Sequence, residues 1–256
     1  MREGRAFHAA PDSPRLAILR RPDRTEFWTE TVGREPSVYG ERWTESDGRA
    51  YRSFEPARSK LSAAIVKGWS GPVPSPGEGW LYLGAASGTT ASHVADLVGP
   101  TGRVYAVERS LRPFSRLVAL ADRWPNLLPI LGDAREPTAY AALMPPVHGL
   151  YADIAQADQV EIVLANATLL LEGTGASVVV ALKTASMGRD ASAAQHVRRA
   201  EETLADLLDL EPTVRLDPFH KGHYLVGGTA RSGRLGPARP TVSRPPRVPS
   251  RERRRR

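Results

Sequence analysis

The sequence contains no cysteine, and this absence excludes disulfide bonds, thiolate metal sites and thiol catalysis. It also has no apolar run of about 18 residues, so no membrane-spanning helix is expected. The first thirty residues are charged throughout and lack the apolar centre that a secretory signal needs. We therefore expect a cytoplasmic protein without a membrane segment.

The composition is that of a folded domain with an appendage, because 41% of the 256 residues are apolar and 25% are charged. The positive charge is concentrated at one end. Residues 229–256 contain ten Arg and one Glu and so carry +9, whereas the whole chain carries +7, which leaves −2 on residues 1–228. With five prolines and few apolar residues, this segment is predicted to be a disordered tail that loosely binds nucleic-acid phosphates. A tail that only aids solubility is the alternative.

A stretch rich in proline and glycine, residues 71–79, separates the chain into two parts. Before it, residues 15–19, 25–32 and 37–43 have the size of short strands, and a helix is expected over residues 59–67. The sequence therefore predicts three regions: a small β-rich module over residues 1–76, a main domain over 77–228 and the tail over 229–256.

Strand and helix patterns alternate in the main domain. Strand-sized apolar runs lie at residues 80–83, 104–107, 127–131, 147–151 and 176–182. Apolar residues at helical spacing lie between them, at residues 89–98, 110–122, 157–171 and 192–208. This α/β repeat of about 20 to 25 residues is typical of a doubly wound, mostly parallel sheet. Residues 213–216 and 223–227 have no helix between them and are predicted to complete seven strands as an antiparallel edge hairpin.

Ligands of such sheets bind beyond the carboxyl ends of the strands, so the residues that follow each apolar run are the candidates for a site. Small residues, 84–90, follow the first strand and would let a ligand approach the backbone, with Thr89 expected to cap the next helix. Glu108 follows the second strand and can accept hydrogen bonds from both hydroxyls of a ribose. Asp133 follows the third strand and can accept from an exocyclic amine, and Asp153 follows the fourth.

Each of these acids alone is more often a helix cap or a loop residue. A glycine turn and three acids in register, however, match the layout of a site for S-adenosylmethionine. The G-x-G-x-x-G spacing that is usual in nicotinamide-binding proteins is missing from the loop after the first strand. The pattern therefore favours an S-adenosylmethionine-dependent methyltransferase fold over a dehydrogenase.

Several longer segments carry a more specific resemblance. They are LYLGAASGTT (81–90), VYAVE (104–108), NLLPILGDAR (126–135), YADIAQADQVEI (151–162), YGER (39–42), YRSFEPARSKLSAAI (51–65), ALKTAS (181–186) and LDPFHKGHYLVGG (216–228). Together they resemble the fibrillarin family, in particular its archaeal-type members. The resemblance covers residues 37–228 and leaves the tail outside.

The resemblance implies a methyltransferase that uses S-adenosylmethionine to methylate the ribose 2′-hydroxyl in ribosomal or transfer RNA. It also implies partners: a box C/D guide RNA, a Nop-domain scaffold protein and, indirectly, a kink-turn-binding protein. By the family pattern the cofactor site comprises Gly84, Ala85, Ser87, Gly88, Thr89, Thr90, Glu108, Arg109, Asp133, Ala134, Asp153, Ile154, Ala155 and Gln156. The family's catalytic residues fall on Lys60, Asp153, Lys183 and His223, and no metal is implied.

The chemistry supports these catalytic residue types. A ribose hydroxyl is a very weak acid, so its attack on a methyl sulfonium needs a base or nearby cations. Our hypothesis is that Lys183 is the base beside the cation of Lys60, that Asp153 orients Lys183, and that His223 positions the ribose or a phosphate. His220 is the competing histidine, and we prefer His223 because it stands directly before the final strand, as the family's histidine does.

Three departures from the family pattern leave other functions open. Gly222 stands where Asp is common, Ala152 where Gln is common, and Thr184-Ala185 where an Ala-Arg pair is common. One alternative is a catalytically weak or inactive assembly subunit of the same particle. The other is a methyltransferase that acts on a protein side chain such as glutamine. Both rank below guided RNA methylation because all four catalytic residue types are present.

Overall fold

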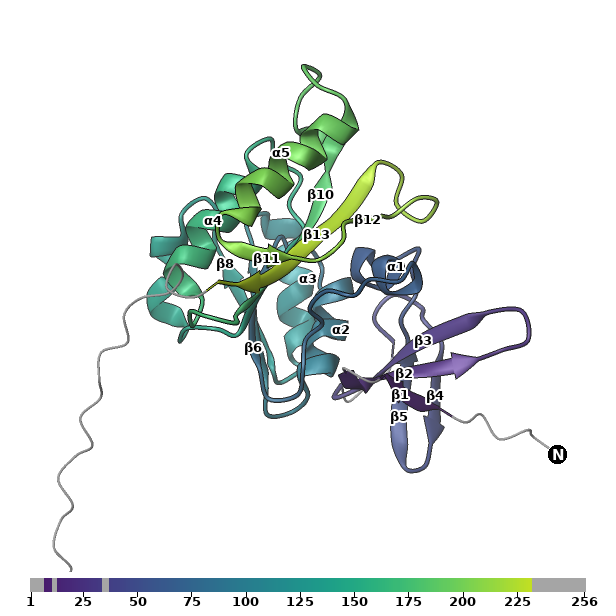
Figure 1. The fold of residues 1–256 in the computed structure, drawn as a ribbon. Coiled ribbons are helices and arrows are strands. Elements are labelled where there is room, and N and C mark those ends of the chain that lie inside the picture. The colour runs from purple at the N-terminus through teal and green to yellow at the C-terminus, as the bar shows by residue number, and fades with distance from the viewer. Residues whose placement is uncertain (1–6, 11–12, 34–36, 232–256) are drawn as a thin grey trace, which may run out of the picture.

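The structure, a computed structural model, describes residues 7–10, 13–33 and 37–231 (Figure 1). Most of the predicted tail, residues 232–256, lies outside the described residues. Within the part of the chain that the structure describes, none of the helices is both long and apolar enough to cross a bilayer.

The N-terminal region forms an antiparallel sheet of five strands in the order β1-β2-β3-β5-β4. The strands are β1 (His8–Ala10), β2 (Ser13–Arg20), β3 (Thr25–Glu30), β4 (Trp43–Ser46) and β5 (Arg49–Ser53). Asp47 and Gly48 both have positive φ and form the tight turn between β4 and β5, a turn type that favours Asp-Gly. The sheet confirms the predicted β-rich character of this region.

The prediction of a strand over residues 37–43 is wrong. Residues 37–42 form an irregular loop with a bend at 38–40, and the strand begins only at Trp43. The reason is the buried carboxylate of Glu41, which accepts from the backbone N–H groups of Val38 and Tyr39 at 2.8–3.0 Å. These local hydrogen bonds satisfy the backbone in place of a neighbouring strand.

The main sheet runs in the order β11-β13-β10-β9-β6-β7-β8, and β12 pairs alongside β13. Its strands are β6 (Gly79–Leu83), β7 (Arg103–Glu108), β8 (Leu127–Leu131), β9 (Gly149–Ala152), β10 (Ser177–Lys183), β11 (Leu208–Leu210), β12 (Val214–Arg215) and β13 (His223–Ala230). The pairs among β6 to β10 are parallel, and β13 pairs antiparallel with β10, β11 and β12. The mostly parallel, seven-strand path confirms the predicted fold class.

The end of the sheet differs from the prediction in three ways. The helix expected to reach residue 208 ends at Ala205, and residues 208–210 form the edge strand β11 instead. Because β13 lies between β10 and β11, the β12–β13 pair is not an edge hairpin. The strand β13 also extends to Ala230, two residues into the segment predicted as tail, and Arg231 donates its backbone N–H to Leu207.

Helices cover both faces of the main sheet: α1 (Lys60–Val66), α2 (Thr89–Val98), α3 (Leu111–Ala121), α4 (Gln159–Leu170) and α5 (Ala193–Ala205). Side chains alternate across the sheet, so Leu81 and Leu83 of β6 join the core under α4 and α5. Trp80 and Tyr82 join the core under α1, α2 and α3. Short 3-10 turns, η1 (Pro137–Ala139), η2 (Ala141–Leu143) and η3 (Thr184–Ser186), connect the remaining elements.

The N-terminal sheet packs on α2 through strands β2 and β3 (Figure 1). A fully buried ionic cluster lies at this contact. Arg52 on β5 donates from Nη2 to Asp96 on α2 at 2.7 Å and from Nη1 to Glu41 at 2.6 Å. Trp124 donates its indole N–H to the second oxygen of Asp96 at 2.8 Å. This cluster ties the N-terminal sheet to the main domain, although the predicted boundary at residue 76 lies between them. An apolar core that includes residues from both regions adds to the contact.

Candidate active site

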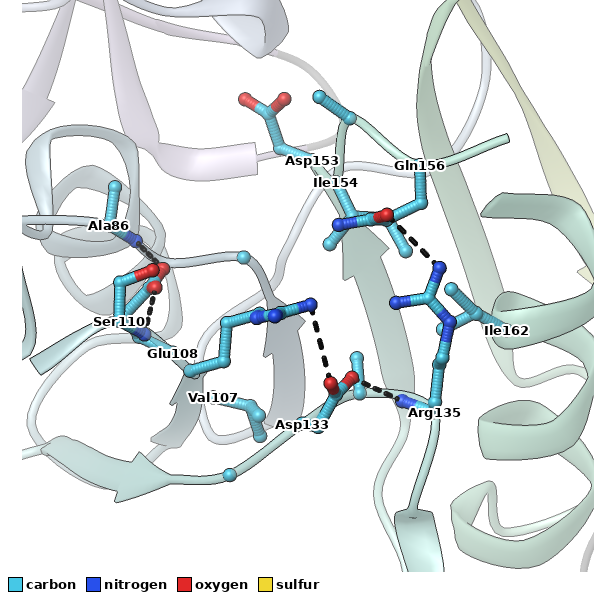
Figure 2. Close-up of a pocket in the computed structure, with 15 residues that line it drawn as sticks. Ala86, Val107, Glu108, Ser110, Asp133, Arg135, Asp153, Ile154, Gln156 and Ile162 are labelled. Atoms are coloured by element: carbon cyan, nitrogen blue, oxygen red, sulfur yellow. Dashed lines mark hydrogen bonds and ion pairs between the residues drawn. The ribbon is translucent and has the colours of Figure 1, made fainter. Parts of the chain in front are cut away.

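The carboxyl ends of β6, β7, β8 and β9 meet around one pocket of about 230 Å³ (Figure 2). We call this the cofactor pocket. Its lining includes these residues expected from the sequence: Gly84, Glu108, Arg109, Asp133, Ala134, Asp153, Ile154, Ala155 and Gln156. It also includes Ala86, from the predicted loop 84–90, and residues that the sequence did not single out: Val107, Ser110, Gly132, Arg135 and Ile162.

The turn after β6 requires a glycine at its first position. Gly84 has φ of +77°, and a Cβ atom there would overlap the backbone oxygen of Asp153. The backbone N–H of Asp153 in turn bonds to the carbonyl of Leu83 at 2.9 Å. The two chain segments that border the cofactor pocket are therefore in direct contact, and only a residue without a side chain fits between them.

The rest of this turn supports α2 rather than the pocket. Ala85, Ser87, Gly88, Thr89 and Thr90 were expected in the cofactor site, but none of them lines the pocket. Thr89 does not cap α2, because Gly88 occupies the N-cap position with φ of +90° and lies against Leu117 and Leu120 of α3. Thr90 is buried and donates its hydroxyl to Ser59, the N-cap of α1, at 3.1 Å.

Glu108, at the end of β7, has a fixed orientation in the pocket wall. One carboxylate oxygen accepts from the backbone N–H of Ala86 at 3.0 Å, and the other from that of Ser110 at 2.7 Å. Each oxygen retains a second lone pair. The carboxylate is therefore preorganised to accept from a pair of neighbouring hydroxyl groups.

The far wall contains two arginines that pair with acids (Figure 2). Arg109 lies 3.4 Å from Asp133, which also accepts from the backbone N–H of Arg135 at 3.0 Å. The guanidinium of Arg135 donates to both oxygens of Asp158 at 2.6 and 2.8 Å and to the side-chain oxygen of Gln156 at 3.0 Å. The hydrogen bonds from Arg135 lower the pKa of Asp158. Arg135 thereby links the loop after β8 to the loop after β9.

Lys60, Asp153, Lys183 and His223 form what we call the four-residue cluster, beside the cofactor pocket. Lys60, the first residue of α1, donates to both carboxylate oxygens of Asp153, at 2.7 and 2.8 Å. Lys183 ends β10 and His223 begins β13, and the two are direct partners in the antiparallel ladder. Side chains of such partners lie on the same face of a sheet.

The surroundings of His223 favour its neutral imidazole form. Its Nδ1 lies 3.0 Å from the carbonyl oxygen of Lys221 and must therefore donate, so in the neutral form the lone pair is on Nε2. Burial lowers the pKa of His223, and the charges of Lys60 and Lys183 lower it further against the opposing effect of Asp153. His223 therefore lies within electrostatic range of the other three residues of the cluster.

One detail differs from the sequence-based hypothesis, in which Asp153 orients Lys183. Asp153 is paired through both of its oxygens with Lys60 instead. His220, the competing histidine, uses its Nε2 to donate to the carbonyl of Pro56 at 2.9 Å. This contact ties the loop before β13 to the segment before α1, and it gives His220 a structural role.

The departures at Thr184 and Gly222 are in contact with each other. The Thr184 hydroxyl donates to the Gly222 carbonyl at 3.0 Å, and Gly222 adopts a φ of +69° that favours glycine. The pair joins the ends of β10 and β13 directly beside Lys183 and His223. Ala152, the third departure, is fully buried in β9.

Fold and pocket together define a class. A mostly parallel sheet with an antiparallel last strand, and a pocket at the carboxyl ends of its central strands, is the fold of the S-adenosylmethionine-dependent methyltransferases. The family model for fibrillarin matches residues 17–232. The chain belongs to the fibrillarin family.

Three relatives show how far the similarity extends. The fibrillarin-like rRNA/tRNA 2′-O-methyltransferase of Aeropyrum pernix is 41% identical over 195 residues, which cover 76% of this chain and 83% of that protein. The crystal structure of Aeropyrum pernix fibrillarin with natively bound S-adenosyl-L-methionine superposes with a TM-score of 0.79 at 36% identity, covering 89% of this chain and 100% of the other. A fibrillarin/Nop5p complex gives a TM-score of 0.72 at 32% identity, covering 90% and 100%.

Proposed function

We propose that this protein transfers a methyl group from S-adenosylmethionine to the ribose 2′-hydroxyl of ribosomal or transfer RNA. The observation that carries the proposal is the four-residue cluster of two lysines, a carboxylate and a neutral histidine beside the cofactor pocket. The function is the one named for relatives about 40% identical to this chain. The proposal includes a cytoplasmic location, which fractionation of cells that express the tagged protein would test.

The residues of the cofactor pocket fit S-adenosylmethionine. The carboxylate of Glu108, oriented by two backbone N–H groups, suits the two ribose hydroxyls of the cofactor. Asp133 offers an acceptor for the adenine amine, and Gly84 permits the close contact between the two chain segments that border the pocket. When bound, the cofactor supplies a methyl group activated by a positively charged sulfur.

The protein's own groups then act on the RNA. We assign to Lys183 the removal of the proton from the 2′-hydroxyl, and to the ammonium group of Lys60, which Asp153 holds in place, the stabilisation of the developing alkoxide. His223 is neutral, and its Nε2 accepts a hydrogen bond that orients the ribose. Because the attacking oxygen must approach the methyl carbon in line, positioning supplies much of the acceleration.

We further propose that the enzyme works inside a guide particle. Residues 1–228 carry a formal charge of only −2, whereas a protein that binds RNA unaided is expected to have a strongly basic surface. In this proposal a box C/D guide RNA selects the target, a Nop-domain scaffold holds the enzyme, and a kink-turn-binding protein recruits the RNA. A relative has been crystallised with such a scaffold, Nop5p.

The experiment is methyl transfer from tritium-labelled S-adenosylmethionine in a particle rebuilt with scaffold, kink-turn-binding protein and a matched guide. We expect label on an RNA target with a ribose at the selected position and none on its 2′-deoxy twin. Label on both targets would refute the 2′-hydroxyl as acceptor. Label on a protein in an RNA-free mixture would favour a protein methyltransferase, and no label with normal cofactor binding would favour an inactive assembly subunit.

A further inference from the structure

Gln159, the first residue of α4, is completely buried although its side chain is a polar amide. A buried amide lowers stability unless its donors and acceptor are satisfied. The three hydrogen bonds of this amide all go to backbone groups beside the site. It lies outside the residues that line the cofactor pocket and outside the four-residue cluster.

The amide binds Lys183 and the cofactor loop, residues 153–156, at the same time. Its oxygen accepts from the backbone N–H of Lys183 at 3.2 Å. Its nitrogen donates to the carbonyl of Gln156 at 3.1 Å and, more weakly, to the carbonyl of Lys183 at 3.5 Å. One side chain therefore joins the strand that carries Lys183 to the loop that borders the cofactor pocket.

The sheet topology explains why Lys183 needs this partner. The N–H of Ser177 donates to the carbonyl of His148, the residue just before β9. Backbone groups alternate in direction along a strand, so every second residue of β10 from Ser177 onward, Lys183 included, points its N–H toward β9. The parallel ladder between β9 and β10 ends at the pair Val180 and Ala152. Beyond it β9 no longer accompanies β10, and the backbone of Lys183 would have no partner on that side.

The amide of Gln159 takes the place of the missing strand. It presents a C=O and an N–H to the backbone of Lys183, as a peptide group of β9 would have done. On the opposite side, Lys183 is flanked by His223 of β13. The next residue, Thr184, donates its N–H to the carbonyl of Gly222, just before β13, so the backbone at Lys183 and Thr184 is held from both sides.

We propose that Gln159 is a positioning residue that fixes Lys183 relative to the cofactor loop, and so sets the distance between the lysine Nζ and the site of methyl transfer. This inference rests on the proposed function, because it assumes that Lys183 takes part in methyl transfer. Gln159 itself touches neither RNA nor cofactor. Its loss therefore slows the chemical step and leaves cofactor affinity nearly unchanged.

Two substitutions test the proposal. Gln159→Met keeps the length of the side chain and removes every hydrogen bond. Gln159→Glu can reproduce the contacts only as a neutral acid, whose C=O accepts from Lys183 and whose O–H donates to Gln156. Burial raises the pKa of such a carboxyl group, so the neutral form persists above the usual range of glutamate. Gln195→Met is the matched control, because Gln195 also bonds to backbone at a helix start but lies exposed in the capping box of α5.

The measurement is single-turnover methyl transfer in the rebuilt particle as a function of pH, with the cofactor Kd of the isolated chain measured separately. We expect Gln159→Met to lower the rate by about 10- to 100-fold, as small misplacements of reacting groups do. Its cofactor Kd should stay within about threefold, a change of at most about 0.7 kcal/mol. Gln159→Glu should retain most of the rate at low pH and lose it as the pH rises through the pKa of the new carboxyl group.

Three results would overturn the proposal. The first is a methyl-transfer rate of Gln159→Met that lies within about twofold of the rates of the wild type and of Gln195→Met. This result counts only if Lys183→Ala is inactive in the same particle. Another is a loss of rate that the cofactor Kd explains in full. The third is a Gln159→Glu profile parallel to that of the wild type at every pH. If the wild-type particle itself methylates no RNA, the proposed function fails instead, so the two failures are distinguishable.

Discussion

At the scale of single residues, Lys183 carries the largest share of the chemistry in this account. Lys183→Ala removes the proposed base and leaves the cofactor pocket intact, because Lys183 does not line it. General-base catalysis contributes typically about 10²- to 10⁴-fold, so we expect a loss of that size in the methyl-transfer rate. The cofactor Kd, measured by calorimetry, should be unchanged.

Lys67→Ala is the control for this substitution, because Lys67 lies exposed at the end of α1. It should transfer methyl groups at the wild-type rate. A Lys183→Ala enzyme as active as Lys67→Ala would remove Lys183 from the mechanism.

Glu108 makes a complementary prediction about binding. Glu108→Ala removes a carboxylate that has two backbone N–H partners and two acceptor positions toward the cofactor ribose. Hydrogen bonds to charged groups contribute about 1.5–3 kcal/mol, so we expect the Kd for S-adenosylmethionine to rise by about tenfold or more. Glu161→Ala, at an exposed position on α4, is the control. Equal Kd values for the two variants would show that Glu108 does not hold the cofactor.

At the scale of elements, the sequence predicted the long buried strands and their helices best. The strand at residues 127–131 and the helix at residues 89–98 have the predicted bounds, because continuous apolar runs and helical periodicity are strong local signals. The three-residue strand β11 has too few residues for any pattern. The loop over residues 37–42 depends on hydrogen bonds from the backbone to the side chain of Glu41. The spacing of apolar residues in the sequence does not indicate such hydrogen bonds.

The candidate site also has residues that could be predicted from the sequence and contacts that could not. Glu108, Asp133 and Asp153 could be predicted because topology alone brings the carboxyl ends of parallel strands together. The bridge from Arg135 to Asp158 and the contact from Gln159 to Lys183 could not, because they join loops through side chains whose directions only the folded structure defines. Arg135 stands only two residues after Asp133, and this proximity was the one available signal.

The contact between the N-terminal sheet and α2 predicts a pH dependence of stability. His93 on α2 is fully buried between Thr29 and Tyr39. Thr29 already donates its hydroxyl proton to Asp96, so Nδ1 of His93 donates to Thr29. Burial, with a further effect from the charge of Arg52, holds the pKa of His93 well below its ordinary value of 6.5.

A histidine with a lowered pKa in the folded state binds a proton more readily when unfolded. The free energy of unfolding should therefore fall as the pH drops from 6.5 toward the pKa of His93 in the folded state. Above pH 6.5 it should be nearly independent of pH. Urea titrations of the wild type and of His93→Asn between pH 5 and 8 would measure this. The pH slope in this range should be smaller in the variant, and equal slopes would contradict the assignment of His93 as a neutral buried group.

At the scale of the whole molecule, charge is divided between a near-neutral body and a basic tail. We propose that the tail adds sequence-independent affinity for RNA. The strand β13 extends to Ala230, so a truncation that spares the sheet should end after Arg231. Each arginine that contacts a phosphate contributes about 0.7 to 0.9 to the slope of log affinity against log salt. We therefore expect the truncated protein to show a flatter slope in RNA-binding titrations, and an unchanged slope would favour a role in solubility.

The most direct test of guided 2′-O-methylation is to identify the methylated nucleoside by mass spectrometry in two rebuilt particles whose guides differ by a shift of one nucleotide. This account predicts one 2′-O-methylated nucleoside per target, moved by one position when the guide is shifted. Methylation that stays in place when the guide is shifted, or that lies on a base or on protein, would contradict it.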